Sequence, residues 1–437
     1  MNPNKSNCIL TQCFALMKPA LLMLSVLIAG QAAAHTPAPP QQRPIAIVNA
    51  TIHTLTQGVI EEGTVVFDNG RITAVGTNPS IPADAEVIDA SGKYVYPGFI
   101  HGRTTLGLTE IGRIAVGTDL NELGNINPNI RAQVAFHPAS EHIPVAAVNG
   151  ILTAVSTPSG GTIPGKPAAM MTDGFTWEQM TLKEGIGLSI DWPSMNNTDN
   201  YLKALAELQQ AFDKARRYKQ AREAMEAGQA VFHPTDVRWE AMIPVLNREM
   251  PVFISAGEVR QIQAAISWGE KEGLDMVLVG SRDMDLVAGQ LAEKGIPVML
   301  SNVISGPARQ WEGYGQFYSI PKVLHEAGVH FMIAGDASAA YAYRLPHHAA
   351  AAVAFGLPEE EGLKSVTINA ARILGIDDRV GSIEPGKDAT LMITDGNPLE
   401  LWTSKEQVFI QGRRIDMTDK HKRLFERYME KHRQEQL

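Results

Sequence analysis

Polar residues that could do chemistry lie at or beyond the ends of short apolar runs. His101, Arg103 and Thr105 occupy alternate positions, and because successive side chains of a strand point to opposite faces, we expect all three on one face. Ser255 ends a second apolar run, and Asp336 follows a third. Together these residues offer an imidazole, a fixed guanidinium, hydroxyls and one carboxylate that could act as a general base.

The middle of the chain must position these groups, and it alternates short apolar strands with amphipathic helices. Clear strands are predicted at residues 150–156, 251–255, 275–280, 297–301 and 329–334, and helices at 201–229, 258–272 and 283–294. Alternation of wholly apolar strands with helices is typical of a buried parallel sheet. The length and the number of units favour an α/β fold of the (β/α)₈ TIM-barrel type over a doubly wound sheet.

Two β-rich blocks flank this region. Residues 45–75 contain strand-like runs joined by Asp68-Asn69-Gly70, a strong hairpin signal, and a similar block returns at 389–413. We therefore expect a small composite β-sandwich domain built from residues 43–96 and 381–416, around a barrel at 97–380. The tail at 417–437 is predicted to be a solvated helix that serves as a surface cap and not as a binding element.

The first 34 residues have the pattern of a secretory signal peptide. Lys5 and Lys18 precede a short apolar run, and Ala32-Ala33-Ala34 ends it, so cleavage is expected before His35. A membrane anchor is the alternative, but a dozen apolar residues fall short of the roughly 20 that a spanning helix needs. The expected location is the periplasm or the exterior. Both cysteines lie in this segment, so the mature chain would be held together by core packing alone.

The charge balance restricts the partners. The net charge is −9, and the Lys and Arg residues are scattered, so the concentrated positive charge that nucleic acid requires is missing. No segment after residue 34 is long and apolar enough to predict a membrane span. The remaining partner class is a small-molecule or peptide-like ligand.

Several motifs resemble the amidohydrolase superfamily. Residues 96–106 (YPGFIHGRTTL) resemble its first barrel strand, where Pro-Gly-Leu-Ile-Asp precedes His-x-His, and residues 333–338 (IAGDAS) resemble the eighth-strand segment ending in Asp. Residues 366–375 (VTINAARILG) and 381–389 (GSIEPGKDA) resemble its C-terminal helix and return strand. Residues 107–112 (GLTEIG) and 177–180 (WEQM) resemble exported members near imidazolonepropionases and Xaa-Pro dipeptidases.

The resemblance implies a barrel that hydrolyses C–N bonds with one or two divalent metals, typically zinc, and an Asp that takes a proton from the bound water. Carried over residue by residue, only Asp336 matches. Arg103 and Thr105 stand at the His-x-His positions and Ser255 at the strand-five His position. An Arg has no lone pair to give, and hydroxyls alone are poor ligands, so the metal is expected to be absent or non-standard. His101 with Asp336 is the alternative, minimal metal site.

Two functions remain open. The first is a hydrolase acting on C–N bonds of small amide or peptide-like substrates with altered or minimal metal use. The second is a catalytically silent relative that binds a ligand or supports a metal-bearing partner, as a homo-oligomer or hetero-oligomer. In either case we expect Arg103 to pair with Asp336 at the barrel mouth, with Asp336 as the catalytic carboxylate. His101, Arg103, Thr105, Glu110 and Ser255 are the expected substrate-binding residues.

One further motif imitates a phosphate-binding loop. Residues 160–166 (GGTIPGK) fit G-x-x-x-x-G-K, but Pro167 follows where a Ser or Thr is needed. We expect a flexible loop over the barrel mouth instead. The histidines His137, His142, His347 and His348 are interpreted as solvent-exposed or capping residues.

Overall fold

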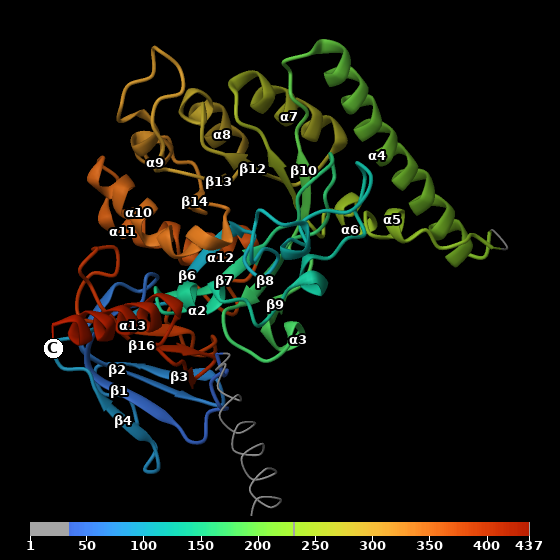
Figure 1. Ribbon diagram of the computed structural model, residues 1–437. Coiled ribbons are helices and arrows are strands. Elements are labelled where there is room, and N and C mark those ends of the chain that lie inside the picture. Colours follow the sequence, from blue (N-terminus) through green and yellow to red (C-terminus); the bar gives the residue numbers. More distant parts are fainter. Residues whose placement is uncertain (1–34, 230–231, 437) are drawn as a thin grey trace, which may run out of the picture. The chain divides into compact units, whose positions relative to one another are not determined.

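The computed structural model describes residues 35–229 and 232–436 (Figure 1). The predicted signal peptide and both cysteines lie outside the described residues. Residues 37–437 belong to one compact unit, which contains all the helices and strands described below.

The β-rich domain combines strands from both ends of the chain (Figure 1). Its central contact is between β5 and β15, which pair antiparallel. The strand order is β17-β16-β15-β5-β1-β2-β3, and β4 pairs with β1 on a separate branch. The bounds are β1 (Ile45–His53), β2 (Val59–Asp68), β3 (Arg71–Gly76), β4 (Glu86–Asp89), β5 (Tyr94–Pro97), β15 (Leu391–Thr394), β16 (Lys405–Ile410) and β17 (Arg413–Arg414).

This sheet folds over on itself. The rings of Phe67 on β2 and Phe409 on β16 lie edge to face with centroids 5.3 Å apart, although three strands separate β2 from β16 in the sheet. In a flat sheet four strand spacings would hold them about 19 Å apart. The two ends of the sheet must therefore face one another across a shared apolar core, which is the packing of a sandwich.

The barrel is built from two groups of strands. Five parallel strands run in the order β10-β11-β12-β13-β14, and a second group runs β6-β7-β8-β9 with β6 parallel to β7. The bounds are β6 (Phe99–Thr104), β7 (Ile151–Ser156), β8 (Ala168–Met171), β9 (Thr181–Lys183), β10 (Leu188–Asp191), β11 (Val252–Ser255), β12 (Met276–Gly280), β13 (Val298–Leu300) and β14 (Phe331–Ile333).

Hydrogen bonds join the two groups at both seams. At one seam the Thr105 N–H donates to the carbonyl of Ala337 over 2.7 Å, just beyond β6 and β14. At the other, the segment leading into β8 pairs antiparallel with β10 through Gly165 and Ser189. The fold is a TIM barrel with a β-rich domain, and one of its walls runs in the opposite direction to the rest.

The antiparallel wall corrects two expectations. The alternation of the sequence predicted parallel strands throughout, but β8 pairs antiparallel with β7. Residues 160–166, expected to form a flexible loop, enter this wall, and Thr162, Ile163, Pro164 and Gly165 are buried. Their backbone groups pair with β10 and with residues 125–131, so the glycines serve close backbone packing instead of loop mobility.

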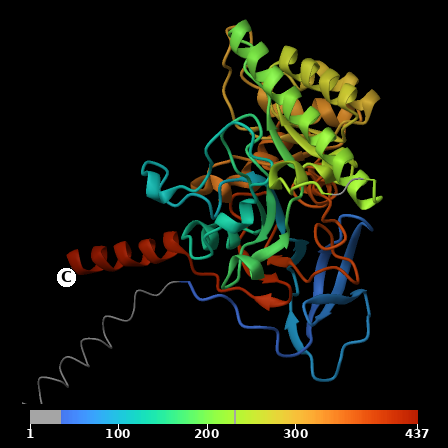
Figure 2. The same ribbon diagram turned by 90° about the vertical axis from the view of Figure 1, so that its right-hand side faces the viewer.

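Helices cover the outside of the barrel and extend from it (Figures 1 and 2). The long helix α4 buries Phe212 and Ala215 in the main core, as predicted for residues 201–229. No helix among the described residues could cross a bilayer. The bounds are α2 (His142–Ala147), α3 (Trp177–Met180), α4 (Thr198–Glu226), α5 (Val237–Glu240), α6 (Ile243–Leu246), α7 (Val259–Glu272), α8 (Ala288–Lys294), α9 (Gln316–Glu326), α10 (Leu345–Ala354), α11 (Glu359–Ser365), α12 (Ile368–Leu374) and α13 (Lys420–Glu435), with short 3-10 turns at η1 (Ala115–Gly117), η2 (Ala132–Ala135), η3 (Asp285–Val287) and η4 (Ala339–Arg344).

A buried ion pair fastens three distant segments together. The Asp173 carboxylate pairs with Arg413 on β17 and accepts a hydrogen bond from the backbone N–H of Ala38. Arg413 in turn donates to the carbonyl of Ala38 at 3.4 Å. Asp173 is buried, so these contacts stabilise a carboxylate that is shielded from water.

Candidate ligand pocket at the barrel mouth

A small cavity lies inside the barrel toward the carboxyl ends of the strands. Its volume is about 10 Å³, which is about the least that admits one water molecule. Its floor is apolar, and its polar groups come from four strand ends. The lining includes Val155, Phe253, Val279 and Met299, together with Arg103, Thr157, Ser189 and Ser255.

Arg103 is the charged group of this cavity, and its partner corrects the prediction. The guanidinium lies 3.9 Å from the carboxylate of Asp191 at the end of β10, and forms no ion pair with Asp336 in the described chain. Both side chains remain about a third exposed, so the pair is solvated and weak. Arg103 and Ser255 are the two predicted ligand-binding residues that the structure brings together.

His101 is not on this face, which corrects the expected alternation. Between His101 and Thr104 the strand β6 advances three residues while β7 advances two, from Ala154 to Ser156. The extra residue is a β-bulge, and it places Gly102 and Arg103 together on the cavity. His101 points to the opposite side and is fully buried.

His101 lies in a dry seam between β6 and β14. A Cβ built on Gly335 would lie 3.3 Å from His101 Nε2 and 3.6 Å from His348 Cδ2, so both rings press against that glycine. Neither ring nitrogen of His101 has a hydrogen-bond partner among the described residues. Burial, and after it the nearby His348, lower the pKa of His101 to about 3, although a backbone contact with Asp336 raises it. The imidazole is therefore neutral at physiological pH.

His348 is buried, contrary to the exposed or capping role expected for it. Its Nδ1 accepts hydrogen bonds from the backbone N–H groups of Val303 and Ile304, both at 3.3 Å. An Nδ1 that accepts carries no proton, so the proton of the neutral ring is on Nε2. Burial lowers the pKa of His348 to about 4, although the Asp336 carboxylate raises it.

Asp336 and Thr105 lie beside this seam and not in the cavity lining. Asp336 Oδ1 accepts from the backbone N–H of Ser338 at 2.9 Å, which fixes the turn after β14. Thr105 Oγ1 accepts from the N–H of Ala339 at 3.1 Å. Both side chains thus bind the start of the loop that follows the eighth strand.

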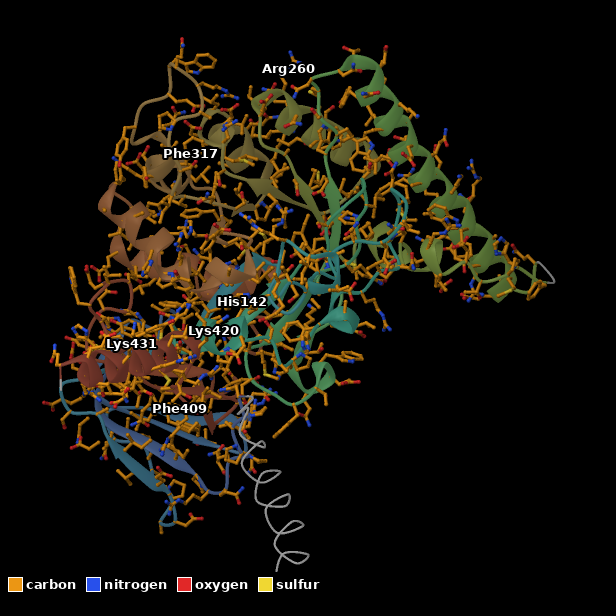
Figure 3. The ribbon with its side chains drawn as sticks, in the orientation of Figure 1. His142, Arg260, Phe317, Phe409, Lys420 and Lys431 are labelled. Atoms are coloured by element: carbon orange, nitrogen blue, oxygen red, sulfur yellow. The ribbon has the colours of Figure 1, made fainter. Side chains whose placement is uncertain are left out.

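Glu110 belongs to a third location, in the long loop after β6. Its Oε2 accepts from the Ser140 hydroxyl at 2.5 Å, and its carbonyl lies 3.1 Å from Nε2 of His142 at the start of α2 (Figure 3). These contacts fasten the loop to α2. The six predicted site residues are consequently divided among the cavity, the seam and this loop.

Comparisons with known proteins agree on one family. Residues 283–418 match the amidohydrolase family model, a stretch that includes Asp336 but not Arg103 or Ser255. A crystal structure of an amidohydrolase from Thermotoga maritima is 27% identical and has a TM-score of 0.79, covering 85% of this chain and 99% of its own. Imidazolonepropionase from Geobacillus kaustophilus is 23% identical over 77% of this chain and 84% of its own. Residues 283–418 thus form an amidohydrolase family domain, and the whole chain is similar in fold to a solved amidohydrolase.

A second curated amidohydrolase is much longer than this one. The amidohydrolase tasK of Hapsidospora irregularis is 23% identical over 80% of this chain, and the matched part spans 39% of that protein. The resemblance found in the sequence is thereby confirmed at the level of the superfamily.

The donor atoms of this chain do not fit the divalent metal that the superfamily implies. At the cavity they are a guanidinium, three hydroxyls and the Asp191 carboxylate, whereas zinc sites are built from imidazole, thiolate and carboxylate donors. His101, the alternative ligand, faces the seam. In the described chain no three His, Cys, Asp or Glu residues gather as a metal site would require.

Sequence reasoning missed Asp191, Ser189 and Thr157. The run 188–191 (LSID) is short and lies between a Gly-rich turn and a Pro, so its apolar period was too brief to predict a strand. Ser255 was predicted because it is a polar residue at the end of an apolar strand. Asp191 has the same position on β10, so it would have been predicted too if residues 188–191 had been recognised as a strand.

Proposed function

We propose that this amidohydrolase relative binds a small anionic or amide-bearing ligand at the barrel mouth and does not hydrolyse it by the metal-dependent route of the superfamily. The Arg103 guanidinium carries the proposal, because it stands on β6 where a metal-binding imidazole is expected and points toward the cavity. A guanidinium donates several hydrogen bonds and keeps its charge at any relevant pH.

The other polar groups of the cavity support the same ligand chemistry. The hydroxyls of Thr157, Ser189 and Ser255 can each donate to an oxygen atom, and Asp191 holds the guanidinium at the cavity through a weak pair. A carboxylate or an amide oxygen could exchange with Asp191 at small cost, because that pair is solvated.

The size of the cavity argues against a substrate enclosed in the barrel. About 10 Å³ is far below the roughly 300–1,000 Å³ of pockets that enclose small molecules. A ligand larger than water must therefore sit at the mouth, against Arg103, or displace that side chain.

Hydrolysis of C–N bonds in small amide or peptide-like substrates is the second candidate. It is favoured by the family match around Asp336 and by a 72-residue stretch that is 38% identical to N-substituted formamide deformylase of Arthrobacter pascens. In that case Asp336 would act as the base, and it would need a rearrangement that brings it to the cavity.

Thermal unfolding with N-acetyl-L-alanine and with acetamide tests the first candidate. The former carries both a carboxylate and an amide, and the latter an amide alone. Saturating N-acetyl-L-alanine should raise the Tm of the wild type, since a ligand that binds only the folded state stabilises it. Arg103→Met should remove most of that shift, whereas Arg238→Met, at an exposed ion pair on α5, should preserve it.

Two further measurements separate the candidates. Metal content of the purified protein and release of amine from the same probes would be followed with and without added Zn²⁺. Stoichiometric metal, or turnover that needs Asp336, would replace the binding proposal by the hydrolase. An Arg103→Met protein that keeps the full ligand-induced shift would remove Arg103 from the site.

A further inference from the structure

The C-terminal helix α13 leaves most of its surface uncovered. Asp419 caps its first turn by accepting hydrogen bonds from the N–H groups of His421 and Lys422. The Arg423–Glu141 ion pair and a ring contact between His421 and Tyr343 join this end to the barrel region. Beyond Arg423 no residue of the helix is buried, and in Figure 2 the helix projects away from the strands.

One side of the projecting part carries all of its large apolar residues, with His432 and Glu435 joining them only in the last turn. Leu424 and Met429 are 37% and 38% exposed, and Phe425 and Tyr428 are 66% and 62% exposed. At about 100° per residue these four side chains occupy an arc of about 140°. Exposure of the Phe425 and Tyr428 rings to water is unfavourable in free energy, and contact with an apolar partner would remove much of that cost.

The basic residues of the helix lie mainly along the two edges of this face. By the same angular spacing, Lys422 and Arg433 flank one edge of the apolar arc, and Lys420, Arg427 and Lys431 flank the other; Figure 3 labels Lys420 and Lys431. The acidic residues Glu426 and Glu430 lie outside this arc, and Glu435, in the last turn, is the one acid that falls within it. The helix carries six Lys and Arg residues against three Glu, in a chain whose net charge is −9.

Basic residues at both edges of an apolar face match an anionic lipid surface. The aromatic side chains can enter the boundary between headgroups and acyl chains while the flanking Lys and Arg side chains reach the phosphates. The in-helix ion pairs Lys431–Glu435 and Arg433–Glu430 are solvated, so they can exchange with lipid phosphate at little cost.

We propose that α13 binds this protein to the surface of an anionic membrane, lying in the interface without crossing it. A second copy of the chain is a poorer partner. Pairing of two α13 helices through their apolar faces would place the basic edges of one against the basic edges of the other, and like charges in those positions repel.

Co-sedimentation of the full chain with lipid vesicles tests the proposal. Vesicles of phosphatidylglycerol mixed with phosphatidylcholine should bind the protein at about 0.05 M salt, and pure phosphatidylcholine vesicles should bind it far less. Raising the salt to about 0.5 M should weaken binding, because it screens the charges. The double variant Phe425→Gln and Tyr428→Gln should bind about tenfold or more weakly, since both apolar anchors are lost.

Matched variants separate this role from others. Glu426→Gln, on the opposite side of the helix, should bind as well as the wild type, and Lys422→Gln with Lys431→Gln should bind several-fold more weakly. Far-UV circular dichroism would establish that the helix persists in each variant. Equal binding to both kinds of vesicle, or binding that survives loss of Phe425 and Tyr428, would overturn the proposal. So would vesicle-independent dimerisation that requires these two residues.

Discussion

Two places on β6, two residues apart in the sequence, have opposite physical characters. Arg103 reaches a partly open cavity, keeps its charge and has a solvated partner in Asp191. His101 is enclosed in the seam against Gly335 and His348 and is kept neutral by burial. Arg103 can exchange its partner for a ligand, whereas His101 can contribute only to the stability of the fold. Position at a strand end therefore does not by itself make a residue part of a binding site.

The bulge in β6 causes this difference. Without the extra residue, His101 and Arg103 would share a face, and because Ile100 and Gly102 lie in the barrel interior, that face would be the outer one and the cavity would lose its guanidinium. With it, the polar groups at the end of the strand are divided between water and the packed seam. The cavity around Arg103 and the seam around His101 should therefore respond differently to mutation and to pH.

Acid should destabilise the protein mainly through the seam. Because the pKa values of His101 and His348 are lowered to about 3 and about 4, the unfolded state takes up protons first as the pH falls below 6.5. Their contribution to stability is complete above pH 6.5 and is lost as the pH falls toward 4. Each proton lowers the free energy of unfolding by about 1.4 kcal/mol per pH unit.

Urea denaturation at a series of pH values measures this slope. In His101→Leu the slope between pH 6.5 and 4 should decrease by the contribution of one proton. Parallel profiles for the two proteins would show that His101 is not buried as a neutral ring.

His348→Leu should destabilise the protein by about 2–4 kcal/mol at neutral pH, because the N–H groups of Val303 and Ile304 lose their acceptor. His137→Leu, at an exposed position, is the control and should change stability by less than about 0.5 kcal/mol. A small effect at His348 would mean that water satisfies both amides.

His101→Leu should stabilise the protein at neutral pH by about 1–3 kcal/mol. Both ring nitrogens lack partners in the described chain, and an apolar side chain of similar size removes that desolvation penalty. Thermal unfolding at neutral pH gives the sign directly. A loss of stability would indicate that His101 has a polar partner. In that case both His101 and Arg103 on β6 would make polar contacts.

Asp191→Asn should have the smallest effect on stability, below about 1 kcal/mol, because its pair with Arg103 is long and partly exposed. The same variant should still show the Tm shift with N-acetyl-L-alanine, since the guanidinium is then freer to bind it. Destabilisation by several kcal/mol would mean that the pair is structural and that the cavity is part of the core.

The sequence predicted elements better than it predicted side-chain directions. The helices at 258–272 and 201–229 and the strands that became β7, β11, β12, β13 and β14 all follow from the spacing of apolar residues. The antiparallel β8 and the short β10 were not predicted, because no helix separates either of them from the strand before it, so they fall outside the alternation of strands and helices.

The candidate site was predictable only in part. Ser255 ends a strand, and regular geometry was enough to expect it at the cavity, whereas Arg103 reaches the cavity only through the bulge in β6. The pairing of Arg103 with Asp191 depends on a bulge and on an unrecognised strand, and the burial of His348 depends on a helix that packs against the β13 loop. Such features arise from tertiary packing, which a single sequence does not encode in any local pattern.

The contact among Asp173, Arg413 and Ala38 restricts the order in which parts of the fold can form. Arg413 follows Ala38 by 375 residues and Asp173 by 240, so this contact can form only after the intervening chain has been synthesised. The strands of the β-rich domain are likewise drawn from residues on both sides of the barrel. That domain can therefore be completed only after the barrel segments between its two halves have been made.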